Sequence, residues 1–183
     1  MKKTADDNSY AKISEDSVEI FGQVFPLKNT RFPPTYYTTG ELKSFDIPDT
    51  VIDFMGKKIL IGGIMRLYED GKFHGTVIDK IYAYEHKMQL FKIGGGIYFY
   101  KSGSLESFYL KEITETDFIV NGKKLVFFEG QQVFFHEKSG LPKTIKFVRT
   151  KVFQGKEYNA IELSETGEIT DRIMGPPRGY DYD

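Results

Sequence analysis

The hairpin signal of this 183-residue chain is Leu67-Tyr68-Glu69-Asp70-Gly71-Lys72-Phe73. A three-residue hairpin loop is typically a type I turn followed by a residue in the left-handed backbone region. Glycine adopts that region without the steric penalty of a Cβ atom, so Gly71 would close the loop. Leu67 would then lie opposite Phe73, and the segment predicts an antiparallel β-hairpin.

The same order of apolar, polar and glycine residues returns four more times. The further copies are Tyr36-Tyr37-Thr38-Thr39-Gly40-Glu41-Leu42, Phe99-Tyr100-Lys101-Ser102-Gly103-Ser104-Leu105, Phe135-His136-Glu137-Lys138-Ser139-Gly140-Leu141 and Leu163-Ser164-Glu165-Thr166-Gly167-Glu168-Ile169. In the fourth copy Ser139 occupies the position of the glycine. In every copy the expected cross-strand pair is apolar, with Phe135 opposite Leu141 in the fourth. Such pairs stabilise a sheet by roughly 0.2–1 kcal/mol each.

A second turn precedes the first in most copies. It contains Gly22, Gly56, Gly122 or Gly155, while the third copy has Lys87-Met88 in that place. Helical periodicity is nearly absent from the chain. We therefore predict an all-β protein, in which tandem antiparallel β-hairpin repeats form a twisted or rolled meander sheet. The alternation of apolar residues slips after the glycine turns, which predicts β-bulges near Ser44, Gly75 and Ser107.

The repeats define the domain organisation. About five hairpin repeats occupy residues 18–174, which we expect to form a single β-repeat domain. Residues 1–17 are expected to be a polar N-terminal tail, and residues 175–183 a C-terminal tail.

The amino-acid composition of the chain narrows the range of partners that we expect. The 25 basic and 26 acidic residues give a net charge of −1, so the electrostatic footprint of a nucleic-acid-binding protein is missing. No apolar run is long enough for a spanning helix. The start of the chain lacks a signal peptide, which fits a cytoplasmic protein or an exported one written without its leader. An extracytoplasmic location, at the cell surface or in the periplasm, is favoured, with a lipid anchor upstream of residue 1 as one route to it.

The sequence contains no set of residues with the types and spacing of a catalytic site. The chain has no cysteine, and His74, His86 and His136 do not share the spacing of a metal site. The run Gly94-Gly95-Gly96 leads into a strand, whereas phosphate loops lead into a helix. We therefore predict no catalytic residue, no metal ligand and no cofactor, and a protein that is not an enzyme.

One row of side chains is a candidate for binding. Tyr37, Tyr68 and Tyr100 occupy the same place in three copies, each opposite a polar residue. Tyrosine combines apolar area with a polar tip and is enriched in interfaces. These three tyrosines are the predicted binding residues.

The recurrent hairpin of Leu67–Phe73 and Phe99–Leu105 resembles that of the bacterial MORN-like repeat proteins, the group that contains the YwqK-type antitoxin-like proteins. The likeness covers about residues 18–174. It implies stacked β-hairpins and, for many members, export and an unassigned role. It implies no catalytic residues.

Three functions are compatible with these observations. The first is a non-enzymatic protein-interaction or surface-binding repeat module of a bacterial exported protein, which would bind through its sheet face or through an exposed strand edge. The second is a cytoplasmic antitoxin or immunity-type protein that neutralises a partner. The third is a closed barrel with an apolar ligand cavity. The sequence leaves the identity of the protein partner and the oligomeric state open.

Overall fold

The computed structural model describes residues 8–78, 80–120, 122–153 and 156–174, and these contain strands and no helix. The strands up to residue 80 are β1 (Lys12–Ile13), β2 (Ser17–Ile20), β3 (Gln23–Pro26), β4 (Thr35–Tyr36), β5 (Leu42–Phe54), β6 (Lys57–Leu67) and β7 (Phe73–Val77). The strands that follow are β8 (Tyr82–His86), β9 (Gln89–Phe99), β10 (Leu105–Leu110), β11 (Thr114–Val120), β12 (Lys123–Phe127), β13 (Gln132–Phe135), β14 (Pro142–Phe153), β15 (Lys156–Leu163) and β16 (Ile169–Met174). The all-β prediction is confirmed.

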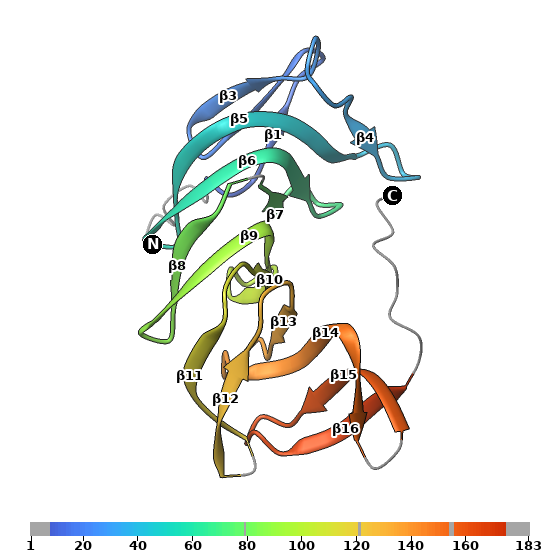
Figure 1. The fold of residues 1–183 in the computed structure, drawn as a ribbon. Coiled ribbons are helices and arrows are strands. Elements are labelled where there is room, and N and C mark those ends of the chain that lie inside the picture. Colours follow the sequence, from blue (N-terminus) through green and yellow to red (C-terminus); the bar gives the residue numbers. More distant parts are fainter. Residues whose placement is uncertain (1–7, 79, 121, 154–155, 175–183) are drawn as a thin grey trace, which may run out of the picture. The chain divides into compact units, whose positions relative to one another are not determined.

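Most of these strands belong to one open antiparallel sheet, which is not closed into a barrel (Figure 1). Its order is β16-β15-β14-β13-β10-β9-β7-β6-β5-β4, and β8 pairs with β9 beside this path. β1, β2 and β3 form a three-stranded sheet, and β11 pairs with β12. Consecutive strands are mostly joined by hairpins, as the prediction of a meander required.

The chain divides into two compact units. The first contains the described residues up to Lys80 together with Gly95–Gly103. The second contains Ile81–Gly94 and the described residues from Ser104 onward. Strand β9 begins in the second unit and ends in the first.

The glycine turns have the predicted geometry. In the second copy, the N–H of Tyr68 donates to the carbonyl of Lys72 at 2.8 Å, and the N–H of Gly71 donates to the carbonyl of Tyr68 at 2.8 Å. Gly71 has a φ of 82° in the left-handed region. The predicted pair of Leu67 with Phe73 forms. The corresponding pairs of the first and last copies also form, Tyr36 with Leu42 and Leu163 with Ile169.

The fourth turn differs from the prediction. Phe135 pairs with Pro142 and not with Leu141. The N–H of Gly140 donates to the carbonyl of His136, four residues earlier, because Ser139 adds one residue to the loop. The longer loop moves the strand register by one residue.

A β-bulge follows the turn in the first two copies. In the pairing of β4 with β5 the extra residue is Lys43, and in the pairing of β6 with β7 it is His74. Each lies three residues after the turn glycine and next to the predicted position, Ser44 or Gly75. The bulge lets apolar side chains on both sides of it face the core, which explains the slip in alternation.

Two-residue turns close the hairpins β2–β3, β5–β6 and β8–β9. Met55 and Gly56 both have positive φ, 53° and 73°, as a type I′ turn requires. The turn between β8 and β9 uses the same conformation without glycine, since Lys87 has a φ of 52° and Met88 a φ of 60°. The missing glycine of the third copy therefore does not remove the hairpin.

Phenylalanine rings fill the core of each unit. In the first unit, ring centroids lie 4.8 to 5.8 Å apart among Phe21, Phe54, Phe73 and Phe99. In the second unit they lie 5.1 to 6.4 Å apart among Phe91, Phe108, Phe118, Phe127 and Phe135. Phe73 and Phe99 are apolar positions of the glycine turns, so each repeat contributes part of its turn motif to the core.

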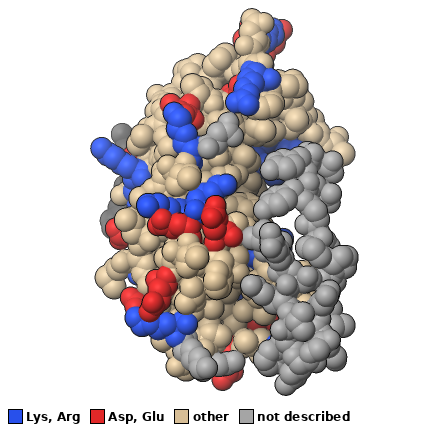
Figure 2. Space-filling model, viewed as in Figure 1, with Lys and Arg blue, Asp and Glu red and all other residues tan. Residues whose placement is uncertain are grey.

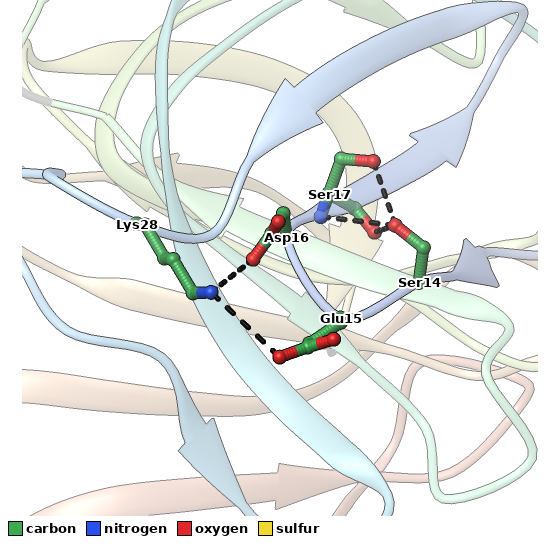
Figure 3. A network of polar contacts seen from close by, with 5 residues as sticks. All are labelled: Ser14, Glu15, Asp16, Ser17 and Lys28. Atoms are coloured by element: carbon green, nitrogen blue, oxygen red, sulfur yellow. Dashed lines mark hydrogen bonds and ion pairs between the residues drawn. The ribbon is translucent and has the colours of Figure 1, made fainter.

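The segment before β2 takes part in the first unit. Tyr10 forms a β-bridge with Lys72, and the N–H of Ala11 donates to the carbonyl of Gly71 at 2.9 Å. The bend between β1 and β2 is held by hydrogen bonds between Ser14 and Ser17, and the ammonium of Lys28 pairs with the carboxylates of Glu15 and Asp16 (Figure 3). Residues 8–17 of the predicted N-terminal tail thus contribute strand pairing, while residues 1–7 and the predicted tail 175–183 lie outside the described residues.

Candidate binding surface

The first unit carries a cluster of rings on the sheet face opposite its phenylalanine core. Tyr68 and His74 stack, with ring centroids 4.4 Å apart and planes 29° apart. The His74 ring lies 5.4 Å from that of Tyr98, and the guanidinium carbon of Arg66 lies 5.7 Å from the centroid of Tyr98. We call these four residues, Arg66, Tyr68, His74 and Tyr98, the outer-face cluster.

Strand alternation explains why the outer-face cluster is outside the core. Leu67, Phe73 and Phe99 are buried, and Arg66, His74 and Tyr98 are their direct neighbours along the chain. Successive side chains of a strand point to opposite faces of the sheet. The four residues of the cluster are all partly buried.

Two glycines make room for Tyr98. A Cβ atom on Gly75 would lie 2.6 Å from the Tyr98 ring and 2.4 Å from the carbonyl oxygen of Ile97. A Cβ atom on Gly96 would lie 3.0 Å from the ring and 3.1 Å from its hydroxyl oxygen. The Tyr98 side chain therefore lies along the sheet, over the space that these glycines leave. A side chain at either position would displace the ring.

Among the described residues, the guanidinium of Arg66 has an aromatic neighbour and no carboxylate neighbour. Within the described parts of the chain, no carboxylate lies within 4.0 Å of its guanidinium. Its strand partners are Ser44 and Gly75, neither of which carries charge. A partly buried cation without a carboxylate retains its capacity for a charge-assisted hydrogen bond.

Some of the exposed cations have carboxylate partners. Lys101 pairs with Asp70 at 2.8 Å in the first unit, and Lys92 pairs with Glu112 at 2.9 Å in the second. The hydrogen bond from Lys101 holds the pKa of Asp70 below its ordinary value. Figure 2 shows basic and acidic side chains beside one another on the face that it displays.

The predicted tyrosine row links successive repeats. The hydroxyl of Tyr37 donates to the carbonyl of Leu67 at 2.7 Å, and that of Tyr68 donates to the carbonyl of Phe99 at 2.7 Å. Burial, followed by the charge of Glu69, raises the pKa of Tyr37. Tyr100 is partly buried and has a polar or ring contact of its own. The structure thus gives the hydroxyls of Tyr37 and Tyr68 a role within the fold.

A histidine takes the tyrosine position in the fourth copy. Nε2 of His136 lies 2.8 Å from the carbonyl oxygen of Leu163. Because a carbonyl only accepts, this nitrogen donates. Leu163 directly precedes the next glycine turn, as Leu67 and Phe99 do. His136 therefore makes the same type of link as the tyrosines.

The structure brings together residues that were not among the predicted binding residues. Of the predicted row, only Tyr68 belongs to the outer-face cluster. In the sequence, strand alternation predicts that Arg66 and Tyr98 face away from the core, and it gives no other signal for them. Nothing in the sequence distinguishes His74 from an ordinary surface histidine.

The described part of the chain offers no alternative centre built on a metal. No group of three His, Asp or Glu side chains within it could hold an ion. His86 is buried, and its Nε2 lies 2.8 Å from the carbonyl oxygen of Gly140. The described residues also form no helix that could cross a membrane.

Comparisons of the chain with family models, with curated proteins and with solved structures each found no match.

Proposed function

We propose that this protein is a non-enzymatic interaction module, which binds a protein partner through the outer-face cluster. The observation that carries this proposal is the guanidinium of Arg66, a partly buried residue, which lies over the ring of Tyr98 with no carboxylate of the described residues within ion-pair distance. We also propose that the protein is exported to the cell surface or the periplasm. The same proposal places it among the MORN-like repeat proteins.

The composition of the cluster supports protein binding. Tyrosine and arginine are enriched among the residues that dominate binding energy in protein interfaces. Ordering flexible side chains costs about 0.5–1.5 kcal/mol each when an interface forms. In the cluster, stacking of Tyr68 on His74 and the seating of Tyr98 over Gly75 and Gly96 order these side chains before binding.

The proposal is tested by affinity capture with matched variants. The wild-type protein, a double variant Arg66→Ala/His74→Ala and a control variant Lys146→Ala are immobilised and exposed to extracts of the source organism. Lys146 is a suitable control because it is an exposed cation 4.7 Å above an aromatic ring, that of Phe134, in the second unit. A protein that is retained by the wild type and the control but not by the double variant supports the proposal. Equal retention by all three proteins contradicts it.

A further inference from the structure

We infer that the partner presents a carboxylate to Arg66, and that this carboxylate belongs to an acidic segment of a protein. The inference rests on the proposed function and adds the chemistry of the partner. Arg66 is the central contact, because its planar guanidinium can donate two parallel hydrogen bonds to one carboxylate.

The geometry around Arg66 prepares it for such a contact. The ring of Tyr98 lies beneath the guanidinium, with 5.7 Å between the guanidinium carbon and the ring centroid. Because Gly75 and Gly96 carry no side chain, that ring lies close to the backbone of the sheet, and its face is placed to support the cation. A guanidinium that is already oriented loses less entropy when it binds a planar anion.

A second cation lies in the same region of the sheet. Lys43 is the residue next to Ser44, the strand partner of Arg66. Its ammonium lies 5.9 Å from the ring centroid of Tyr37, and no described carboxylate lies within ion-pair distance of it. Arg66 is also close enough to Tyr37 to lower the pKa of that hydroxyl, against the larger effect of burial. Lys43 thus lies over the ring of Tyr37, and the charge of Arg66 acts on the hydroxyl of the same residue.

The acidic side chains of the neighbouring turns are already engaged. Glu69 accepts a hydrogen bond from the hydroxyl of Thr39 at 2.6 Å. Asp70 pairs with Lys101 at 2.8 Å. These carboxylates therefore leave Arg66 and Lys43 available to a partner.

The same turn residues favour a protein over a nucleic acid or a sulfated polysaccharide. A polymer with closely spaced negative charges would bring several of them near Glu69 and Asp70. A protein segment can place single carboxylates at Arg66 and Lys43 and avoid these acids. The net charge of −1 also gives no general attraction to polyanions.

The test is selection of random peptides on the immobilised full chain by phage display. We expect the selected peptides to be enriched in Asp and Glu. The best peptide is then synthesised, and its Kd is measured by calorimetry for the wild type and for Arg66→Gln, Arg66→Lys and Arg172→Gln. Arg172 is the matched control, because its guanidinium carbon lies 6.0 Å from the ring centroid of Tyr158 in the second unit.

The expected pattern distinguishes charge from geometry. Arg66→Gln should weaken binding at least tenfold, and Arg66→Lys should weaken it several-fold because an ammonium cannot make the paired contact. Arg172→Gln should leave the Kd within twofold. Circular dichroism of each variant establishes that the fold is retained.

Three results would overturn the inference. If the selected peptides show no enrichment in acidic residues and His74→Ala abolishes their binding, the inference of a carboxylate is wrong, while the proposed function stands. If selected peptides bind equally to the wild type, Arg66→Gln and His74→Ala, both proposals are wrong. If a heparin fragment binds more tightly than every peptide and depends on Arg66, the partner is a sulfated polysaccharide and not a protein.

Discussion

The hydroxyl of Tyr68 donates a hydrogen bond to the carbonyl oxygen of Phe99, 31 residues later in the chain, at 2.7 Å. This bond joins the turn of one repeat to the residue that precedes the next turn. Tyr37 and His136 make the equivalent bonds to Leu67 and Leu163. The position before the glycine turn therefore has a structural use that is independent of any partner.

The variant Tyr68→Phe separates this structural use from binding. It removes the hydroxyl and leaves the Phe99 carbonyl without its donor, while the ring remains to stack on His74. We expect the free energy of unfolding to fall by about 1 kcal/mol. Urea denaturation followed by circular dichroism measures this change.

The matched control is Tyr36→Phe. The side chain of Tyr36 is 54% exposed, so removing its hydroxyl should change the free energy of unfolding by less than about 0.5 kcal/mol. A loss of the same size in both variants would show that the bond to Phe99 contributes nothing particular.

The turns could be predicted because their cause is local. A glycine such as Gly71 is recognised from its neighbours alone, and its left-handed conformation fixes which residues face each other. The same local rule fails in the fourth copy, because the alignment of the copies predicts the turn residue at Ser139. The structure shows that the chain uses Gly140 and lengthens the loop.

The outer-face cluster could not be predicted to the same extent. Alternation gives the face on which Arg66 and Tyr98 lie, but not which side chains meet there. His74 meets Tyr98 because β7 pairs with β9, although β8 comes between them in the chain. This pairing depends on contacts across the whole unit, and the hairpin pattern of the sequence does not contain it.

Asp70 and Lys101 make a second contact between neighbouring turns, and it can be observed by titration. The hydrogen bond from Lys101 lowers the pKa of Asp70 from its ordinary value of 3.8. In Lys101→Gln we expect this pKa to return toward 3.8, as measured by NMR of the Asp70 carboxyl carbon. The folded protein gains stability from this contact above the ordinary pKa and loses it as the pH falls through the lowered one. Lys138→Gln serves as the control. If the pKa of Asp70 is unchanged in Lys101→Gln, the lowering of that pKa has another cause.

Burial of tyrosine in the second unit predicts a response to alkaline pH. Burial raises the pKa of Tyr84 to about 12, and it raises the pKa of Tyr82 as well. The raised value means that folding favours the neutral form, so this contribution to stability is complete below pH 10 and is lost as the pH rises through about 12. Absorbance at 295 nm should therefore show tyrosines that ionise well above pH 10.

The variant Tyr84→Phe identifies the residue responsible. It should remove one of the late-ionising groups and reduce the fall in stability between pH 10 and about 12. Tyr36→Phe should instead remove a group that is exposed and leave the late ionisation intact. Identical alkaline titrations of the wild type and Tyr84→Phe would contradict the burial of Tyr84.

The seating of Tyr98 over Gly96 can be measured as a coupling energy. The three atoms nearest to a methyl group on Gly96 would all belong to the Tyr98 side chain, at 3.0 to 3.3 Å, so Gly96→Ala should lower the free energy of unfolding by about 1 kcal/mol. In the background Tyr98→Ala this obstacle is gone. Alanine should then be neutral or stabilising by up to about 1 kcal/mol, because it restricts the unfolded chain more than glycine does. A double-mutant cycle by urea denaturation gives the difference between the two backgrounds. If Gly96→Ala costs the same with and without the Tyr98 ring, then glycine is required there for a reason other than this side chain.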